Sequence, residues 1–350
     1  MAINLALKYS PQIDKIWTHG SFVDGKVSQD YDLIGVRSIR ISSPLTVDLV
    51  DYTRSGTERF GTLVEMQDEI QELTMSQDKS WTMSIDNANA SDQLDIKKAG
   101  EALQLQLDEK VIPLYDKHAL KQFAINAGKS VVVAAVSKDN IVGFLGAADV
   151  HFTNNNVPNA DKYLYIGATN HNFLRLSAEY LAIENMAQRS IEKGVTGNVF
   201  DMNVVKVPDA YMATGVQFLA MHKRSGIAPK KIHTMRILTN QRGVDGAVLE
   251  GHHYFDAFVI AKKSAGVYAG VLTANKVAAP IITPTGASHA VTVVGGVSFK
   301  YTLDGSDPRY SATAIAYSAP VVLTSGQTIK VAGFAADKCN SDVTPATYTA

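Results

Sequence analysis

The sequence predicts an α+β body that ends in a small, separate all-β unit. Three observations carry this prediction. A long stripe of apolar residues at helical spacing occupies 91–129, strand-like runs lie on both sides of it, and no helical period appears after residue 288. Hydrophobic residues make up 46% of the 350 positions and charged residues 19%, so we expect a packed core and no global disorder.

Bulk composition excludes several classes of protein. The formal net charge of -1 argues against a strongly basic nucleic-acid binder. A single cysteine, Cys339, cannot form an internal disulfide and is typical of a chain that folds in a reducing compartment. It has no visible histidine partner, so we expect no catalytic role for it. The sequence contains neither a signal-peptide-like start nor a run of ~18 apolar residues, so we expect a soluble protein that does not enter a membrane.

Residues 1–33 are predicted to form an extended arm. Pro11, Gly20 and Gly25 interrupt any regular period, and charges are scattered between them. A floppy tail is the alternative. Trp17 and Phe22 argue against it, because large apolar groups on an arm need a surface to lie on, and a neighbouring subunit would supply one.

Residues 34–90 are predicted to form a protruding β-hairpin. Apolar and polar residues alternate near both of its ends, and the glycine-punctuated run TRSGTERFG (53–61) lies between them. The segment has too little apolar material to close a core, which favours contacts with other subunits. The candidate contact residues in the arm and hairpin are Trp17, Phe22, Arg54, Arg59, Glu65, Asp68, Glu69 and Trp81.

An acidic run at helical spacing lies within this hairpin. It consists of Glu65, Asp68, Glu69 and Glu72. Paired carboxylates can perform acid–base catalysis, but no nucleophile is evident nearby. We therefore prefer a docking surface for basic residues of a neighbour, since charge pairing between subunits sets their register.

Residues 91–129 are predicted to form a spine helix. Leu103, Leu107 and Val111 belong to the apolar stripe, at three- and four-residue steps. Pro113 lies inside this helix, so we expect a kink or a break near Ile112.

Residues 130–235 and 236–272 complete the body. We expect a buried strand at 162–167, a second helix at 170–193, and short strands at 198–208, 216–223, 233–239 and 252–263. The stretch 273–287, with two prolines, is a linker or an extended entry strand. The clean alternation at 297–303 and the turns that follow predict a β-sandwich over 288–350.

Three further groups of residues have a chemical and a structural interpretation. His252 and His253 would need to converge with carboxylates to hold a metal, but neighbouring strand residues point to opposite faces. Asp304 and Asp307 are calcium-type ligands that turn chemistry also explains. A basic cluster either faces DNA or a neighbour, or is a solvated loop: Lys223, Arg224, Lys230, Lys231, His233 and Arg236. We expect no metal, cofactor or catalytic residue.

Several separated blocks resemble one family. They are DYTRSGTERFGTLVEMQDEIQELTMSQDKSWTMSIDNAN (51–89), KYLYIGATNHNFLRLSAEY (162–180), GNVFDMNVVKVPDAYM (197–212) and VLEGHHYFDAFVIAKKSAGVYAG (248–270). Their order and spacing through about residue 270 resemble the major capsid proteins of tailed bacteriophages. The resemblance implies an N-terminal arm (1–33), an extended loop (34–90), a peripheral domain with the spine helix (91–129) and returning strands (236–272), and an axial domain (130–235).

That resemblance implies a structural protein. Copies would assemble into an icosahedral shell of hexamers and pentamers around double-stranded DNA. Assembly would take place in the cytoplasm of a bacterial host, and the finished protein would reside in the virion. A scaffolding protein and a portal would be separate partners, because we see no long N-terminal extension to act as scaffold. Two alternatives stay open: an encapsulin-like compartment for enzyme cargo, and a glycan-active enzyme with an accessory sandwich.

The C-terminal unit resembles a second family. VSFKYTLDGSDPRYS (297–311) and SDVTPATYT (341–349) are similar to the small immunoglobulin-like module at the C-terminus of chitobiases and related hexosaminidases. On a shell, we expect this module to sit on the outer face. We expect it to decorate the shell or to bind surface glycans weakly.

Overall fold

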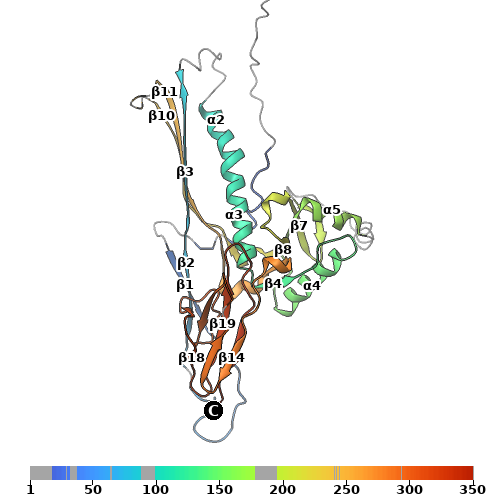
Figure 1. Ribbon diagram of the computed structural model, residues 1–350, viewed down its shortest axis with the longest axis vertical. Coiled ribbons are helices and arrows are strands. Elements are labelled where there is room, and N and C mark those ends of the chain that lie inside the picture. The colour runs from blue at the N-terminus through green and yellow to red at the C-terminus, as the bar shows by residue number, and fades with distance from the viewer. Residues whose placement is uncertain are drawn as a thin grey trace, which may run out of the picture.

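The computed structural model describes residues 18–349 except 29, 32–37, 64, 88–98, 178–194, 240, 242, 244 and 293. Trp17, the first turns of the expected spine helix and most of the expected helix at 170–193 lie outside these residues. The molecule is long (Figure 1). A helix lies beside a long three-stranded sheet at one end, a mixed sheet with two helices projects to one side, and the C-terminal module forms the other end.

The spine helix is interrupted where the sequence predicts it. Helix α2 (Ala99–Gln106) runs into a π-helical turn, η1 (Leu107–Val111), and then into α3 (Ile112–Ile125). The backbone N–H of Ile112 donates to Leu107, five residues back, just before Pro113. Proline lacks an N–H and clashes with the preceding turn, and a wider turn accommodates both defects. Helix α3 ends at Ile125 rather than near residue 129, because Lys129 already begins a strand.

Strand β3 (Gln77–Asp86) corrects the expected hairpin. Only β1 (Ser38–Pro44) and β2 (Asp68–Thr74) pair with each other. Strand β3 pairs along its whole length with β11 (Gly246–Phe255), which also pairs with β10 (Lys230–Thr239). The hairpin is therefore shorter than 34–90, since the cross-strand hydrogen bonds of β3 are made to the returning strands.

A six-stranded sheet forms the axial part. Its order is β4-β13-β8-β5-β7-β6. The strands are β4 (Lys129–Val132), β13 (Val267–Val271), β8 (Val216–His222), β5 (Lys162–Gly167), β7 (Met202–Val207) and β6 (Val195–Val199). Strand β13 was expected among the returning strands of the peripheral domain. It belongs here because it pairs in parallel with β4 and antiparallel with β8.

Two helices and several short elements complete the body. Helices α4 (Ile141–Asn154) and α5 (Ala168–Leu176) pack against one face of this sheet. Of the helix expected at 170–193, α5 covers the part up to Leu176, where the helix ends because Ser177 has an extended backbone; residues 178–193 lie outside the described ranges. The remaining short strands are β9 (Gly226–Ile227) and β12 (Phe258–Val259), and 3-10 turns cover Asp209–Tyr211, Lys223–Ser225, Ala261–Gly266 and Thr273–Asn275.

The C-terminal module consists of two antiparallel sheets. One contains β14 (Ile282–Thr285), β15 (Ser288–Val291) and β18 (Val321–Val322), and the other contains β17 (Ile315–Ala316), β16 (Ser298–Thr302), β19 (Thr328–Phe334) and β20 (Thr344–Thr347). Phe299, Ile329 and Val331 lie in the core between them. Strand β14 lies in the second half of the stretch 273–287, so this half is the expected entry strand rather than a free linker.

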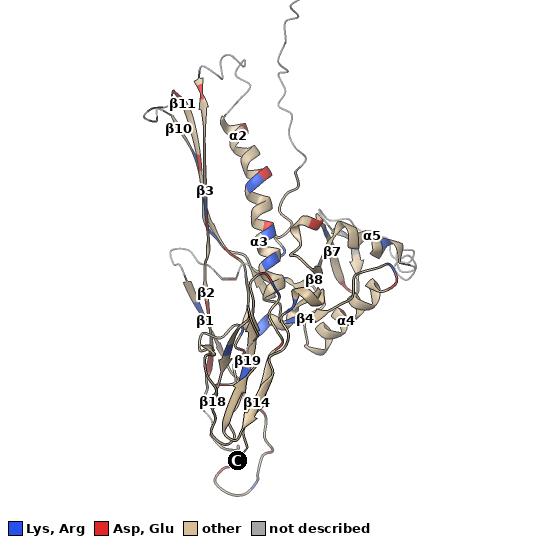
Figure 2. Ribbon diagram, viewed as in Figure 1, with Lys and Arg blue, Asp and Glu red and all other residues tan. Residues whose placement is uncertain are grey.

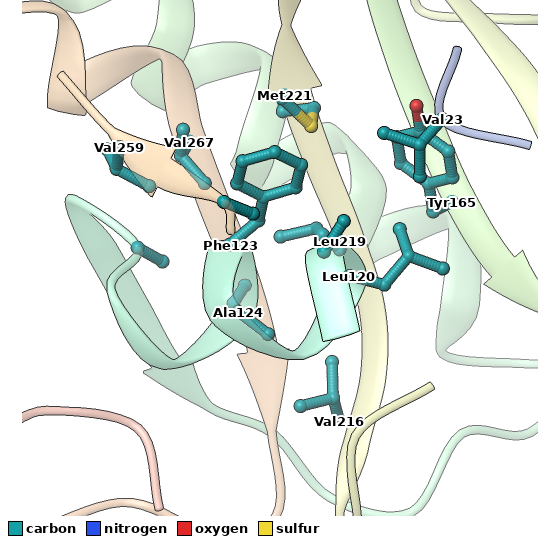
Figure 3. Packing of buried hydrophobic residues seen from close by; sticks show 14 of the residues in the cluster. Val23, Leu120, Phe123, Ala124, Tyr165, Val216, Leu219, Met221, Val259 and Val267 are labelled. Atoms are coloured by element: carbon teal, nitrogen blue, oxygen red, sulfur yellow. The ribbon is translucent and has the colours of Figure 1, made fainter. Parts of the chain in front are cut away.

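The largest core lies where α3 crosses the six-stranded sheet. Leu120 and Phe123 of the helix pack on Leu219, Met221 and Val267 of the strands (Figure 3). Residues from both ends of the chain join this core, namely Phe22, Val23, Val27, Tyr310 and Cys339. The N-terminal segment and the module are thus parts of the folded subunit. No helix in the described ranges is both long and apolar enough to cross a membrane.

Candidate assembly surfaces

The loop between β1 and β2, residues 45–67, exposes an unusual amount of apolar surface. Leu49 is 101% exposed, Leu63 96% and Phe60 85%. Further large apolar residues here are also exposed: Leu45, Val47, Val50, Tyr52 and Met66. The loop projects past the end of the module (Figure 1). So many large apolar side chains exposed in one loop favour a site of protein association.

Three charged residues of this loop are available to a partner. Arg54, Arg59 and Glu65 are exposed, and none of them forms an ion pair with a described residue. The Arg59 side chain only donates a hydrogen bond to the Gly56 carbonyl, 3.2 Å away. Charges at an interface set its register more than its affinity.

Three members of the acidic run, Asp68, Glu69 and Glu72, lie on strand β2 rather than on a helix, so Glu69 faces away from the other two. Asp68 accepts a hydrogen bond from Ser42 at 2.8 Å. Glu72 pairs with Arg40 at 3.1 Å on strand β1, and Glu69 pairs with Lys262 at 3.1 Å. The expected docking surface for a neighbour is therefore largely satisfied within the subunit.

The N-terminal segment is anchored by a buried carboxylate. Asp116 of α3 is 0% exposed and accepts hydrogen bonds from the Ser21 hydroxyl at 2.6 Å and the Phe22 backbone N–H at 2.7 Å. Burial raises the pKa of Asp116, and these hydrogen bonds offset the rise only in part. Phe22, expected to contact a neighbour, is buried in the core of its own subunit. Sequence reasoning missed Asp116, because a lone aspartate in a helix carries no signal.

A second buried carboxylate fixes the root of the hairpin. Asp256 accepts hydrogen bonds from both the backbone N–H and the hydroxyl of Ser76, each at 2.8 Å, and contacts His118 Nε2 of α3 at 2.7 Å. Although burial acts to raise it, the pKa of Asp256 is lowered by these donors and by the Ala257 N–H. The turn between β2 and β3 is thereby tied to the spine helix.

Trp81 lines an open trough on the three-stranded sheet. Its indole N–H donates to His253 at 3.1 Å, and Gly251 leaves room for the ring on the neighbouring strand. The trough has a volume of about 660 Å³ and is lined by Ser80, Trp81, Thr82, Thr234, Arg236, Glu250, Gly251 and His252. His252 pairs with Asp78 at 2.6 Å on the exposed face while His253 is buried, so the two histidines do face opposite ways.

The predicted basic cluster is dispersed. Lys230 pairs with Asp24 at 2.7 Å and Arg236 with Glu250 at 2.7 Å, while the Lys231 ammonium lies over the Tyr254 ring. Figure 2 shows lysine and arginine spread over helix, sheets and module rather than gathered on one face. Lys223 and Arg224 form no ion pair with a described residue. They line a separate cavity of about 320 Å³ together with Asp30 and Asp161.

The aspartates of the module are turn residues. Asp304 accepts the Ser306 N–H and Asp307 accepts the Arg309 N–H, each at 2.9 Å. This is the local hydrogen bonding that favours aspartate in turns. Among the residues that the structure describes, no group of three or more His, Cys, Asp and Glu is placed to hold a metal ion.

Comparisons with known proteins match the two parts of the chain separately. The family model "Fn3 associated" matches residues 294–348, consistent with the immunoglobulin-like module expected there. A comparison with curated protein sequences finds no match.

Many solved structures are similar to the larger part. A chain of "Mycobacterium phage Che8" is 18% identical with a TM-score of 0.63, and the alignment covers 77% of this chain and 98% of that one. A chain of "Capsid structure of the Cyanophage P-SCSP1u" is 12% identical with a TM-score of 0.64, covering 77% and 93%. A chain of "Asymmetric unit of bacteriophage PhiM1 mature capsid" is 12% identical with a TM-score of 0.61, covering 77% and 92%. This chain therefore has the tailed-phage capsid fold, with an immunoglobulin-like module at its C-terminal end.

Proposed function

We propose that this chain is a major capsid subunit. Copies assemble into an icosahedral shell of hexamers and pentamers around phage double-stranded DNA. One observation carries the proposal beyond the fold: the loop 45–67 exposes apolar side chains that its own subunit leaves uncovered. A second copy of the chain is the partner that covers them, as the capsid fold of the similar structures supports. The role is structural rather than enzymatic.

Apolar burial supplies the driving force. Covering a fully exposed leucine or phenylalanine contributes about 1.5–3 kcal/mol, so Leu49, Phe60 and Leu63 together contribute several kcal/mol per interface. Part of this gain offsets the cost of ordering the loop and the subunit. Repetition over a closed shell makes a modest interface sufficient. Arg54, Arg59 and Glu65 would then select the register, and the trough beside Trp81 offers a place for a neighbouring segment.

The double substitution Leu49→Ser with Leu63→Ser tests the proposal. Both side chains are almost fully exposed, so the unassembled subunit should keep its stability within about 0.5 kcal/mol. Shells seen by electron microscopy of infected-cell lysates should disappear, because the lysates contain any scaffold that assembly needs. Val322→Ser is the matched control, since Val322 is 71% exposed but lies on the module. Normal shells from the double variant would refute the role of the loop.

The other partners are part of the same proposal. A scaffolding protein and a portal would act during assembly in the host cytoplasm, and the finished subunit would reside in the virion. Lys223 and Arg224 are the members of the basic cluster left available for non-specific contact with DNA phosphates. Nuclease-protected DNA inside purified particles would separate this function from an encapsulin-like compartment. That compartment and a glycan-active enzyme are not favoured, because the similar structures are phage capsids.

For the module we propose a position on the outer face, where it decorates the shell. Weak adhesion to surface glycans stays a prediction. Co-sedimentation of purified shells with host cell-wall glycans measures it, and shells that stay in the supernatant would leave decoration alone.

A further inference from the structure

One loop of the module reaches into the body. It spans residues 307–312, between β16 and β17. Tyr310 is 8% exposed within the core around α3, and its hydroxyl donates to the Asn126 carbonyl at 2.8 Å. The Arg309 guanidinium, held by Asp307 at 2.8 Å, donates to the Gly128 carbonyl at 3.0 Å and to the Ala127 carbonyl at 3.4 Å. Arg309 is thus a nearly buried cation placed just beyond the end of a helix.

These contacts satisfy carbonyls in the turn that directly follows the spine helix. The last carbonyls of a helix have no partner within it, and they carry partial negative charge. The Asn340 backbone N–H, from the connection between β19 and β20, donates to Ile125 at 3.1 Å. Together with Tyr310 and Arg309, it supplies donors to the consecutive carbonyls of residues 125–128. The module therefore supplies donors to the last carbonyl of α3 and to the turn of residues 126–128 that follows the helix.

The same loop also bonds to the hairpin formed by β1, β2 and the loop 45–67. The Ala312 N–H donates to the Ile70 carbonyl of β2 at 2.9 Å, and Ser311 forms an antiparallel bridge with Gln71. Gln71 is itself buried, and its side chain bonds Val259 at 2.8 Å and Ala261 at 2.9 Å. Strand β2 is therefore bonded to the module through its backbone and to the body through the Gln71 side chain.

The entry to the module is fixed as well. The Lys276 ammonium pairs with Asp342 at 2.6 Å and donates to the Ser130 carbonyl at 2.7 Å. The Cys339 N–H donates to Asn275 at 2.9 Å, and the Val277 N–H donates to Cys339 at 3.0 Å. Cys339 is buried in the core of the body. These contacts are inconsistent with a module that is joined to the body only by a flexible linker.

We propose that the module is an intramolecular clamp. Its loop 307–312 joins the end of α3 to β2 and so fixes the direction in which the loop 45–67 leaves the subunit. The clamp stands on the contacts above, whereas its consequence for assembly rests on the proposed function. Adaptation to neighbours in rings of five and six is then confined to the tip of the hairpin, beyond the Ile70–Ala312 bond.

Cys339 provides a built-in probe, because it is the single cysteine of the sequence and lies at this junction. Arg309→Ala, in the purified, unassembled full-length chain, should increase thiol labelling of Cys339 by about tenfold, as the junction opens more often. Hydrogen exchange should rise together at Ala312, at Asn340 and along β2. Tyr310→Phe removes only the phenolic O–H, keeps the core filled, and should raise labelling in the same direction to a smaller extent.

The control is Thr324→Ala, which removes an exposed contact with Gln327 at the other end of β19. It should leave labelling and exchange unchanged. Wild-type labelling of Cys339 and wild-type exchange along β2 in both Arg309→Ala and Tyr310→Phe would overturn the clamp. These measurements use unassembled subunits, so a negative result would contradict the clamp and leave the capsid proposal intact. Conversely, normal shells from the Leu49/Leu63 double variant would contradict the proposed role of the loop and leave the clamp intact.

Discussion

Single residues show two opposite treatments of a buried polar group. Asp256 has a donor at each carboxylate oxygen, from Ser76, His118 and the Ala257 N–H. The Tyr165 hydroxyl, on β5, is fully buried and has no hydrogen-bond partner among the described residues. Burial raises the pKa of Tyr165 far above its ordinary range. A satisfied buried group stabilises the fold, whereas an unsatisfied one costs free energy.

Tyr165→Phe should therefore be neutral or should raise the free energy of unfolding by up to about 1 kcal/mol. The ring stays in the core beside Val23, and only the unpaired hydroxyl is lost. Urea unfolding of the unassembled subunit measures the change. A loss of more than about 1 kcal/mol would mean that this hydroxyl has a partner that the described residues do not supply.

Asp256→Asn should lower the free energy of unfolding by about 1–3 kcal/mol near neutral pH, because an amide nitrogen cannot accept the bonds that the carboxylate accepts. The folded-state pKa of Asp256 is lowered from the ordinary value of 3.8. Its charge therefore stabilises the fold above that value, and this contribution is lost as pH falls through the folded-state pKa. Unfolding near neutral pH and near pH 3 should show the wild type and the variant converging in acid. A constant difference would contradict the assignment.

At the scale of elements, periodicity found the spine helix but not the details of its path. The spacing of Leu103, Leu107 and Val111 indicated a helix, and Pro113 indicated a defect. A π turn and a kink have the same sequence signature, so only the structure distinguishes them. Strand β3 was assigned to the hairpin because alternation reports a half-buried strand without naming its partner.

Replacing Pro113 with alanine tests the origin of the π turn. Alanine restores an N–H and removes the clash, so the turn 107–111 should relax toward a regular α-helix. We expect the free energy of unfolding to rise by about 1–3 kcal/mol and amide exchange in residues 107–113 to slow. An unchanged exchange pattern would show that packing of α2, rather than the proline, imposes the wider turn.

For the whole molecule, composition located the module but not its attachment. The stretch 273–287, with its two prolines, marked a boundary. Nothing in the pattern indicated that Tyr310 and Cys339 would complete the core of the body, since both look like ordinary residues of a small sandwich. The prediction that Phe22 contacts a neighbour was wrong for the same reason. An apolar residue on an arm indicates burial, but it does not indicate which subunit covers it.

Trypsin should distinguish the projecting loop 45–67 from the junction between the body and the module. In unassembled subunits it should cut first at Arg54 and Arg59, which are exposed in a projecting loop. Lys276, whose ammonium is bonded to Asp342 and Ser130, should resist, so the module should stay attached. Mass spectrometry of the fragments reads the order of cleavage. Early release of the module would contradict a docked arrangement.

Shells extend this experiment to the assembled state. If neighbours cover the loop 45–67, cleavage at Arg54 and Arg59 should slow by at least about tenfold on assembly. Exposed lysines of the module, away from the loop, should be cut at similar rates in both states and so serve as the internal control. Equal cleavage of the loop in subunits and shells would place it outside the contacts.

The module's donors to residues 125–128 have an evolutionary consequence. Their acceptors are main-chain oxygens, which any amino acid provides, so substitutions at these positions keep the acceptors themselves. The side chains are constrained for other reasons: Ala127 is buried in the core, Asn126 accepts a hydrogen bond from the Asn340 amide, and a Cβ at Gly128 would lie 2.0 Å from the Ser264 carbonyl oxygen. Selection for docking then falls on Arg309 and Tyr310. In lineages that lose the module these two residues vanish with it, and the helix end must recruit new donors or be exposed to water.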